Sequence, residues 1–231
     1  MPNLNINDQR LLSRISELGN VGRDSHDRLM RLAASDADQQ GRDRVVSWMR
    51  DRQLKICIDR IGNILGIWDP ASTRAHPVMM GSHIDSVANG GIYDGNYGVL
   101  AGLEVIETLM DAGASPRAPI AVAIFTNEEG ARYQPDMMGS LVYAGGMAVE
   151  TALGIRAADG TTLGGELQRI GYAGDLEPGF LQPKAFIEVH IEQGPVLERE
   201  GLDIGVVENL QGISWQEAVI SGVATMRALH Q

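Results

Sequence analysis

The chain has 231 residues, of which 44% are hydrophobic, 21% charged and 5% aromatic, as in folded globular proteins and unlike disordered or collagen-like chains. Its formal charge of -11 disfavours binding to nucleic acid or anionic membranes, because both are negatively charged. The apolar runs are far shorter than the roughly 20 residues that span a bilayer, and no cationic stretch with an apolar core follows Met1. We therefore expect a soluble, cytoplasmic protein.

Cysteine and glycine usage narrow the kinds of site that the chain can build. Cys57 is the only cysteine, which excludes an intrachain disulfide and a thiolate-rich zinc site. Any metal ion must therefore be held by histidine, aspartate and glutamate. The glycines concentrate between Gly81 and Gly102, where we expect the backbone to bend closely around something.

The N-terminal segments predict two helices and a pair of strands. Apolar residues recur at helical spacing over residues 7–18, and a more polar helical pattern covers residues 36–52. Residues 55–68 are typical of two short strands with a turn at Gly62-Asn63.

Three later apolar runs predict buried strands, and each ends in carboxylates or histidine: residues 77–81, 120–125 and 185–192. The first leads into a predicted helix over 98–109 and the third into a helix that runs through Glu200. This order indicates an α/β fold with a mostly parallel sheet flanked by helices, in which ligands bind at the carboxyl ends of the strands.

The remaining segments carry weaker patterns. Residues 151–183 are interpreted as a connecting lobe with a short helix near 166–170, and two last strands are expected at 204–207 and 215–221. No internal repeat or low-complexity tract is evident.

The first group of chemistry-bearing residues is His83, Asp85 and Asp94, with glycines between and around them. Imidazole and carboxylate ligands suit zinc and similar divalent ions. Residues 83 and 85 of an extended segment point the same way, so Asp85 could accept the second ring N–H of His83 and fix its tautomer. Taken alone, such a His-x-Asp pair is more often a surface or capping arrangement than a metal site.

The second group follows the other two strands. Glu128 and Glu129 are adjacent carboxylates, which repel each other unless a cation or a shared function uses both. In isolation this pair suits an acidic helix N-terminus, and His190 suits a core histidine. What favours a metal site is coincidence, because all three strand ends are predicted to share one edge of one sheet.

Other readings of the motifs fail on their spacing. The glycine-rich segment contains neither G-x-x-x-x-G-K-[ST] nor G-x-G-x-x-G, which argues against a phosphate-binding loop. No G-x-S-x-G occurs, which argues against a serine hydrolase of that type.

Five motifs contain or accompany these residues: Gly81-Ser82-His83-Ile84-Asp85-Ser86, Gly90-Gly91-Ile92-Tyr93-Asp94-Gly95, Thr126-Asn127-Glu128-Glu129-Gly130-Ala131-Arg132-Tyr133, Met138-Gly139-Ser140 and His190-Ile191-Glu192-Gln193-Gly194-Pro195. With these motifs the sequence resembles the amidase, hydantoinase and carbamoylase branch of the M20 metallopeptidase superfamily. The resemblance covers nearly the whole chain, from the first helix to Ser221.

The resemblance implies a zinc-exopeptidase type of catalytic domain with two divalent metal ions, zinc or manganese, with cobalt or nickel as further options. His83 and His190 would be terminal ligands, Asp94 would bridge the ions, and Glu129 would complete the shell of one of them. Asp85 would orient His83 as the second catalytic residue.

The resemblance also implies a reaction. Glu128 would be the general base that takes a proton from metal-bound water, so that hydroxide attacks a carbamoyl or amide carbon. Gln193 would contact the substrate, a small molecule. Members of the branch hydrolyse N-carbamoyl-L-amino acids, N-carbamoyl-β-alanine or allantoate, and the residues around Asn127 and Gly139 lean to the first. An M20 dipeptidase or deacylase is the alternative chemistry.

The resemblance further implies a division of the chain. Residues 1–210 would be the N-terminal part of the di-metal catalytic domain, and residues 211–231 the start of a lid or dimerisation domain. Family members are longer, form homodimers, and carry one more histidine ligand beyond this stretch. We therefore expect the chain to be a truncated, inactive remnant of a longer enzyme.

The last residues suggest how such a truncation could arise. The family places a His-Ala-Gly-Thr-Thr-Pro-Met run soon after the region of Ser221, whereas this chain has an unrelated tail from about residue 225. Codons that can encode Asn followed by this family run, with one A of the Asn codon deleted, encode Thr-Met-Arg-Ala-Leu-His-Gln, the residues at 225–231. A following A would complete a TGA stop. The hypothesis is a single-base deletion, which sequencing of the DNA beyond codon 231 tests.

Overall fold

The computed structural model describes residues 4–73, 75–210, 212, 221 and 222. The chain divides into two compact units, of which the first ends at Ile191 and the second begins at Glu192. The first holds the sheet and helices α1 to α6, and the second holds the short helix α7 (Val196–Glu200).

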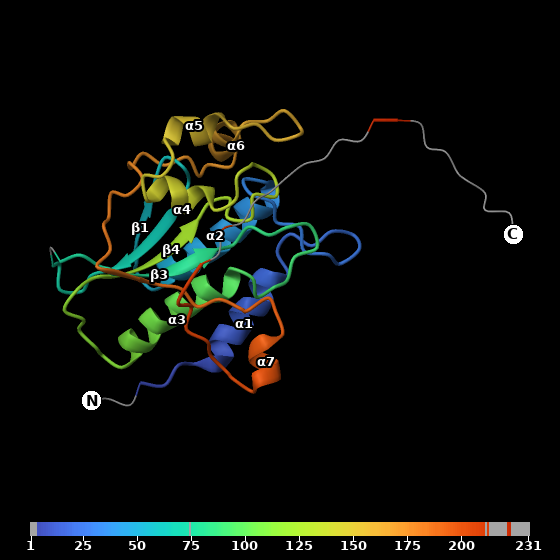
Figure 1. The fold of residues 1–231 in the computed structure, drawn as a ribbon. Helices are drawn as coiled ribbons and strands as arrows, with labels where there is room; N and C mark the ends of the chain where they lie inside the picture. Colours follow the sequence, from blue (N-terminus) through green and yellow to red (C-terminus); the bar gives the residue numbers. More distant parts are fainter. Residues whose placement is uncertain (1–3, 74, 211, 213–220, 223–231) are drawn as a thin grey trace, which may run out of the picture. The chain divides into compact units, whose positions relative to one another are not determined.

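A five-stranded sheet forms the centre of the first unit (Figure 1). Its strands lie in the order β1-β2-β4-β3-β5. The β1–β2 and β2–β4 pairs are antiparallel, whereas the β4–β3 and β3–β5 pairs are parallel. The bounds are β1 Lys55–Ile58, β2 Ile64–Trp68, β3 Val78–His83, β4 Ile120–Phe125 and β5 Ala185–Ile187.

Helices pack around this sheet. Figure 1 shows α3 against the sheet and α1 beyond α3, and these contacts are the main ones of both helices. Side chains of Asn7 and Ser35 accept backbone N–H groups at the starts of α1 and α2, which satisfies donors that a helix end leaves unpaired. The bounds are α1 Asp8–Gly19, α2 Asp36–Asp51, α3 Asn96–Asp111, α4 Met138–Tyr143, α5 Val149–Gly154 and α6 Leu163–Arg169.

The sheet buries apolar side chains on both faces. Alternate residues such as Val122 and Ile124 of β4 enter a large core shared with the helices. Their neighbours Ala121 and Ala123 enter a second cluster with the segment that contains Phe180. A strand covered on both faces has a continuous apolar sequence, and this is why residues 120–125 predict β4 with its observed bounds.

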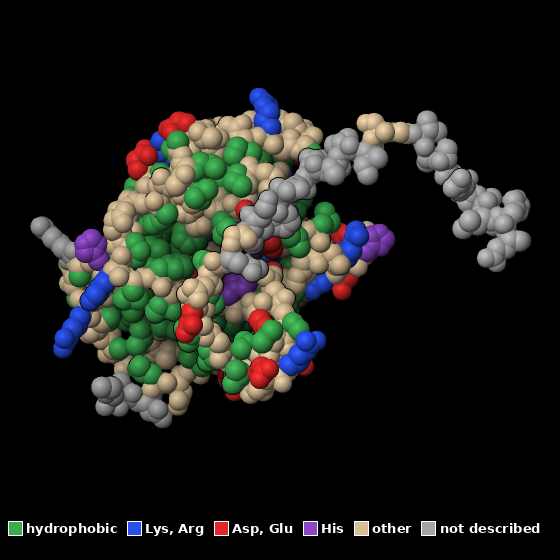
Figure 2. All heavy atoms as spheres, viewed as in Figure 1, with side chains coloured by type: hydrophobic (Ala, Val, Ile, Leu, Met, Phe, Trp, Pro, Cys, Tyr) green, Lys and Arg blue, Asp and Glu red, His purple; other side chains and the backbone are tan. Residues whose placement is uncertain are grey.

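The outer strand β5 is the exposed edge of the parallel part of the sheet. Its side chains Phe186 and Ile187 are 42% and 53% exposed, and Val189 just beyond it is 42% exposed. Figure 2 shows hydrophobic side chains gathered over the middle of the face in view. An exposed apolar edge strand invites pairing with another chain.

The predicted α/β architecture of a sheet flanked by helices is confirmed. The sheet is mixed, and its parallel part consists of the three strands predicted to end in polar residues. The helices predicted over 7–18, 36–52 and 98–109 and the strands of residues 55–68 are also confirmed, with shifted bounds. Helices α4 and α5 were not predicted, because six residues are too few to show a helical period.

Two strand predictions are wrong in whole or in part. The strand predicted over 185–192 ends at Ile187, and residues 204–207 form no strand. Ile204 and Val206 are 82% and 88% exposed, so an apolar run alone did not give them a pairing partner among the described residues. The strand expected at 215–221 and the tail from about 225 lie outside the described residues, apart from Ser221, as does most of the domain expected at 211–231.

Helix lengths and hydropathies also bear on the membrane. In the described ranges, no helix combines the length and the apolar character that crossing a bilayer requires.

Candidate metal centre

The parallel pairing of β3, β4 and β5 brings three polar strand ends to one edge of the sheet. His83, the last residue of β3, stands opposite Phe125, the last residue of β4. β5 runs parallel to β3 on the other side, and His190 follows its end by three residues. The common edge predicted from the sequence therefore exists in the structure.

Three predicted ligands converge at this edge. One ligand atom from each of His83, Asp94 and His190 lies within 4.8 Å of the others. The Nε2 atoms of His83 and His190 lie 3.8 Å and 3.2 Å from Oδ1 of Asp94. The two imidazole rings are stacked, with centroids 6.3 Å apart. Histidine nitrogens and a carboxylate oxygen at this spacing suit a divalent cation.

The tautomers of both histidines follow from their other ring nitrogens. Nδ1 of His83 lies 3.0 Å from the main-chain oxygen of Asp85, and Nδ1 of His190 lies 2.8 Å from that of Ile191. A carbonyl oxygen only accepts hydrogen bonds, so Nδ1 carries the hydrogen in each ring. In the neutral rings, Nε2 then carries the free lone pair, and in both rings this atom lies within 3.8 Å of Oδ1 of Asp94.

The surroundings of the His83 ring nitrogen show whether these residues fit a metal ion. Nε2 of His83 is buried and has no hydrogen-bond partner among the described residues, although Oε2 of Glu128 lies 3.3 Å away. Lone pairs that face a carboxylate repel it unless a proton or a cation lies between them. The residues fit a divalent cation, because one ion would satisfy both imidazoles and the carboxylate.

The turn after β4 places the two adjacent glutamates. The backbone N–H groups of Glu128 and Glu129 donate to the carboxylate of Asp85 at 3.1 Å and 3.2 Å. Asp85 thus holds the turn that carries both glutamates. Glu129 is not a member of the three-residue ligand group, although its charge interacts with those of His83 and Asp94.

The contact between His83 and Asp85 differs in detail from the predicted one. The ring N–H of His83 meets the main-chain oxygen of Asp85 at 3.0 Å, whereas the nearer carboxylate oxygen is 3.8 Å away. The side chain of Asp85 is instead engaged with the glutamate turn. Its main chain fixes the tautomer of His83, and its carboxylate fixes the neighbouring loop.

The carboxylates of this edge are crowded and partly desolvated. Burial raises the pKa values of Glu128 and Asp85, and it raises the pKa of Glu129 to about 7. Each of these carboxyls therefore holds its proton more tightly than in water. A bound cation would lower the pKa values of these carboxyls.

The imidazoles respond to the same crowding. The hydrogen bond with Asp94 raises the pKa of His190 to about 9. Burial acts to lower the pKa of His83, but the negative charges of Asp85 and Glu128 outweigh it and raise this pKa. The site as a whole carries an excess of negative charge, which suits cations.

A glycine makes the close approach of these loops possible. A Cβ atom at Gly95, next to Asp94, would lie 2.5 Å from Nε2 and Cε1 of His83, and its φ of 63° is in the left-handed region. Both features favour glycine. The glycine enrichment in this part of the sequence therefore reflects, at this position, backbone packed against a candidate ligand.

Gln193 and its neighbour Glu192 belong to the second unit. Gln193, the predicted substrate contact, has a φ of 54°. In that unit the carboxylate of Glu192 accepts the N–H groups of Val196 and Leu197 at the start of α7. The roles predicted for Gln193 and for the metal ligands stay predictions.

One contact was missed by sequence reasoning. Oγ of Ser82 donates to Oε1 of Glu188 at 2.5 Å, which links β3 to the segment that carries His190. The signal was present, because Glu188 alternates with His190 along the apolar run, but the sequence did not indicate its partner.

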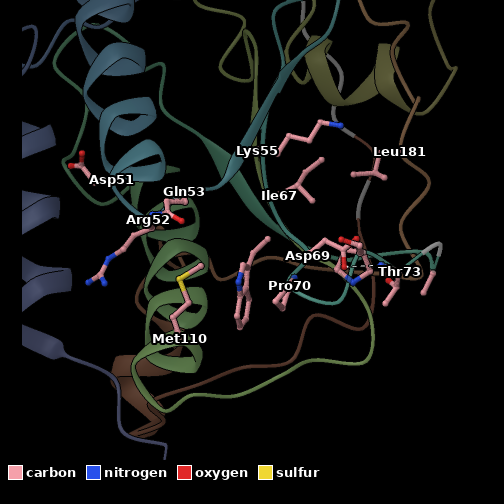
Figure 3. Close-up of a pocket in the computed structure, with 14 residues that line it drawn as sticks. Asp51, Arg52, Gln53, Lys55, Ile67, Asp69, Pro70, Thr73, Met110 and Leu181 are labelled. Carbon is pink, nitrogen blue, oxygen red and sulfur yellow. Dashed lines mark hydrogen bonds between the residues drawn. The ribbon is translucent and has the colours of Figure 1, made fainter.

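A hollow of the described surface lies away from this group. It has a volume of about 1010 Å³ and is lined by residues that include Pro119. Figure 3 shows Ile67, Pro70 and Met110 among its lining residues. Pro119 directly precedes β4, whereas the ligand group follows the carboxyl ends of the strands. None of the candidate ligands lines this hollow.

The fold and the ligand group define an α/β protein with a candidate site for divalent cations. Residues 79–228 match peptidase family M20/M25/M40, which is more than half of the chain. The chain belongs to this family, and the family predicted from the motifs is confirmed.

Similar proteins refine this placement. An N-carbamoyl-L-amino acid amidohydrolase of Geobacillus stearothermophilus is 40% identical over 223 residues, 95% of this chain and 54% of the relative. A probable allantoate deiminase of Oryza sativa subsp. japonica is 33% identical over 225 residues, 94% of this chain and 45% of the relative. The crystal structure of an amidase of the hydantoinase/carbamoylase family from Burkholderia multivorans superposes with a TM-score of 0.84 and 43% identity, covering 87% of this chain and 49% of that one. The chain thus spans about half the length of these relatives.

Proposed function

We propose that the chain carries the metal site of an amidohydrolase that cleaves linear carbon–nitrogen bonds in N-carbamoyl-L-amino acids. The observation that supports this most is the convergence of the Nε2 atoms of His83 and His190 on the carboxylate of Asp94. The bacterial relative named for this reaction supports the substrate class.

The ligand roles in this proposal follow the resemblance to the family. His83 and His190 would be terminal ligands, Asp94 would bridge two divalent ions, and Glu129 would complete the shell of one ion. Zinc and manganese are the first candidates, because both accept imidazole and carboxylate ligands. When bound, such ions lower the pKa of water and polarise a carbonyl group.

The proton transfers belong to the chain's own residues. Glu128 would take a proton from the attacking water and pass it to the leaving amide nitrogen. Burial raises its pKa, which makes its carboxylate a stronger base. Asp85 holds the turn that carries Glu128. The bond between the carbonyl carbon and the amino acid's nitrogen breaks, which releases the amino acid and carbamic acid, and the latter decomposes to ammonia and carbon dioxide. The role proposed for Gln193 is contact with the substrate.

A second candidate substrate is allantoate, which the similarity to the plant deiminase favours. N-carbamoyl-β-alanine and dipeptides are further alternatives from the same superfamily. The cytoplasmic location and the homodimer expected from the sequence stay predictions.

We also propose that the 231-residue chain alone turns over little or no substrate. Two ions with four ligands each need more ligands than the three-residue group supplies, even with Glu129 added. The decisive assay therefore measures ammonia release, with Mn²⁺ or Zn²⁺ added, from this chain and from a longer chain in which it is extended by the remaining length of the Geobacillus stearothermophilus relative.

The substrates in this assay are an N-carbamoyl-L-amino acid, allantoate and a dipeptide, the last followed by release of amino acid. We expect turnover of the carbamoyl compound by the longer chain. In that chain Glu128→Gln should lower kcat by about 10²- to 10⁴-fold and leave Mn²⁺ binding in place. Glu150→Gln is the matched control, since Glu150 is an exposed carboxylate paired with Arg60. Equal activity of the two variants would contradict the proposed role of Glu128.

A further inference from the structure

Arg31 is a fully buried arginine behind the metal centre. Its side chain has 0% exposure. The guanidinium donates from Nε to the oxygen of Ile84 at 2.6 Å, and from Nη1 to the oxygens of Leu18 and Val21, both at 2.8 Å. Nη2 donates to Oδ1 of Asn96 at 2.8 Å.

The acceptors of this guanidinium, in the part of the chain that the structure describes, are all neutral oxygens. Burial lowers the pKa of Arg31 to about 10, which still leaves it charged at neutral pH. Burying a cation without a directly bound anion is costly, by several kcal/mol before compensation. The filling of space alone therefore does not account for an arginine at position 31.

Two of the acceptors belong to the loops that present the candidate ligands. Ile84 lies between His83 and Asp85. Asn96 is the first residue of α3, and its own N–H donates to the oxygen of Asp94 at 2.6 Å. The guanidinium therefore ties together the main chain beside His83 and the side chain of Asn96, whose backbone N–H holds the main chain of Asp94.

The backbone of Arg31 strengthens the first of these connections. Its N–H donates to Oγ of Ser86 at 3.0 Å, and its oxygen accepts the N–H of Ser86 at 2.9 Å. Residues 84–86, which include Asp85, are thus held to Arg31 by both its backbone and its side chain.

We propose that Arg31 is a positioning residue of the metal centre, which sets the distance between the His83 loop and the Asp94 loop. This inference rests on the proposed function, because it takes these residues as ligands. Metal sites need ligand distances within about 0.2 Å of their ideal values, and a rigid planar group with several fixed donors can hold two loops that closely. The cost of burying the charge is offset by hydrogen bonds to both loops.

The packing around Arg31 offers an independent way to disturb it. A Cβ atom at Gly41 in α2 would lie 2.8 Å from Cδ and 3.3 Å from Nε of Arg31. Gly41→Ala would therefore push the guanidinium out of place without removing its charge or its donors. In an isolated helix the same change raises helix propensity by about 1 kcal/mol, so a loss of metal binding could not be ascribed to a weaker helix.

The experiment measures Mn²⁺ affinity of the full 231-residue chain by calorimetry, together with urea unfolding in EDTA. The variants are Arg31→Met, which removes all the side-chain donors of Arg31, and Gly41→Ala. The control is Glu107→Gln, because Glu107 is equally buried but pairs with arginines away from the ligand loops. The absorption spectrum of bound Co²⁺ reports the ligand geometry of each protein.

We expect Arg31→Met and Gly41→Ala each to weaken Mn²⁺ binding by about 10- to 100-fold and to alter the Co²⁺ spectrum. Glu107→Gln should lose folding stability but keep both properties. The inference is overturned if Arg31→Met binds Mn²⁺ as the control does, or, where Arg31→Met does not fold, if Gly41→Ala keeps the affinity of the parent chain. Failure of the parent chain to bind Mn²⁺ would instead contradict the proposed metal site.

Discussion

Replacing Gly95 with alanine should remove His83 from the metal centre. The new Cβ would lie 2.5 Å from Nε2 of His83, whereas carbon atoms in ordinary contact are about 3.5 to 4.0 Å from their neighbours. The ring or the loop must therefore move by about 1 Å. That shift exceeds the roughly 0.2 Å tolerance of metal–ligand distances, so the imidazole could no longer coordinate together with Asp94.

Backbone strain and overpacking both lower the stability of Gly95→Ala. A left-handed conformation costs a non-glycine residue about 1 to 2 kcal/mol, and overpacking typically adds about 1 to 3 kcal/mol. Loss of one ligand should weaken Mn²⁺ binding by at least about 100-fold, equivalent to about 2.8 kcal/mol. Gly95→Ala should therefore lose about 2 to 5 kcal/mol of unfolding free energy and, in its folded state, at least about 2.8 kcal/mol of Mn²⁺-binding free energy.

The assay compares Gly95→Ala with Gly91→Ala, a change in the same loop where an added Cβ meets nothing within 4 Å. Mn²⁺ affinity is measured by calorimetry, and folding stability by urea titration in EDTA. Only Gly95→Ala should lose affinity. Unchanged affinity in Gly95→Ala, or an equal loss in Gly91→Ala, would refute the packing explanation for this glycine.

Three further predictions concern the fold. Burial raises the pKa of Asp59 from 3.8 to about 6. The protonated carboxyl therefore contributes about 3 kcal/mol to the unfolding free energy below pH 4, and this contribution is lost as the pH rises through 6. The difference in unfolding free energy between the parent chain and Asp59→Asn should shrink over this window, and a constant difference would contradict the prediction. Glu107→Gln should lower the unfolding free energy, measured by urea titration, by about 3 to 5 kcal/mol, because it breaks the ion pairs of this buried carboxylate with three arginines. A loss below about 1 kcal/mol would contradict this prediction. Ile187→Lys on β5 should reduce self-association in sedimentation velocity, and no change would argue against pairing at that edge.

The parts of the site that the sequence predicted are those set by strand order. Polar residues after three apolar runs indicated a common edge, and parallel pairing of β3 with β4 and β5 creates it. His83, Asp94 and His190 meet there because each follows such a strand or its loop. Periodicity and strand ends are local signals, and the sequence carries them directly.

The parts that the sequence did not predict depend on contacts between distant residues. Asp85 was expected to reach His83 through its carboxylate, but that carboxylate accepts two N–H groups from the turn after β4. The isolated residues 204–207 have the apolar character of a strand, yet strand formation needs a partner. Neither outcome can be read from local spacing, because each depends on which loop packs beside it.

Buried arginines of the N-terminal segment support two loops of the site in different ways. Arg42 donates to Oγ1 of Thr126 at 3.2 Å, just before the glutamate turn, and pairs with Asp38 at 2.8 Å. Arg31 has no such directly bound carboxylate among its described acceptors. Its charge therefore adds to the potential of a site that otherwise carries excess carboxylates, while Arg42 is largely neutralised by its partner. Arg31 interacts with the charges of Asp38 and Asp85 without a direct ion pair in the described part of the chain. It stands where its hydrogen bonds reach the neighbours of two candidate ligands at once.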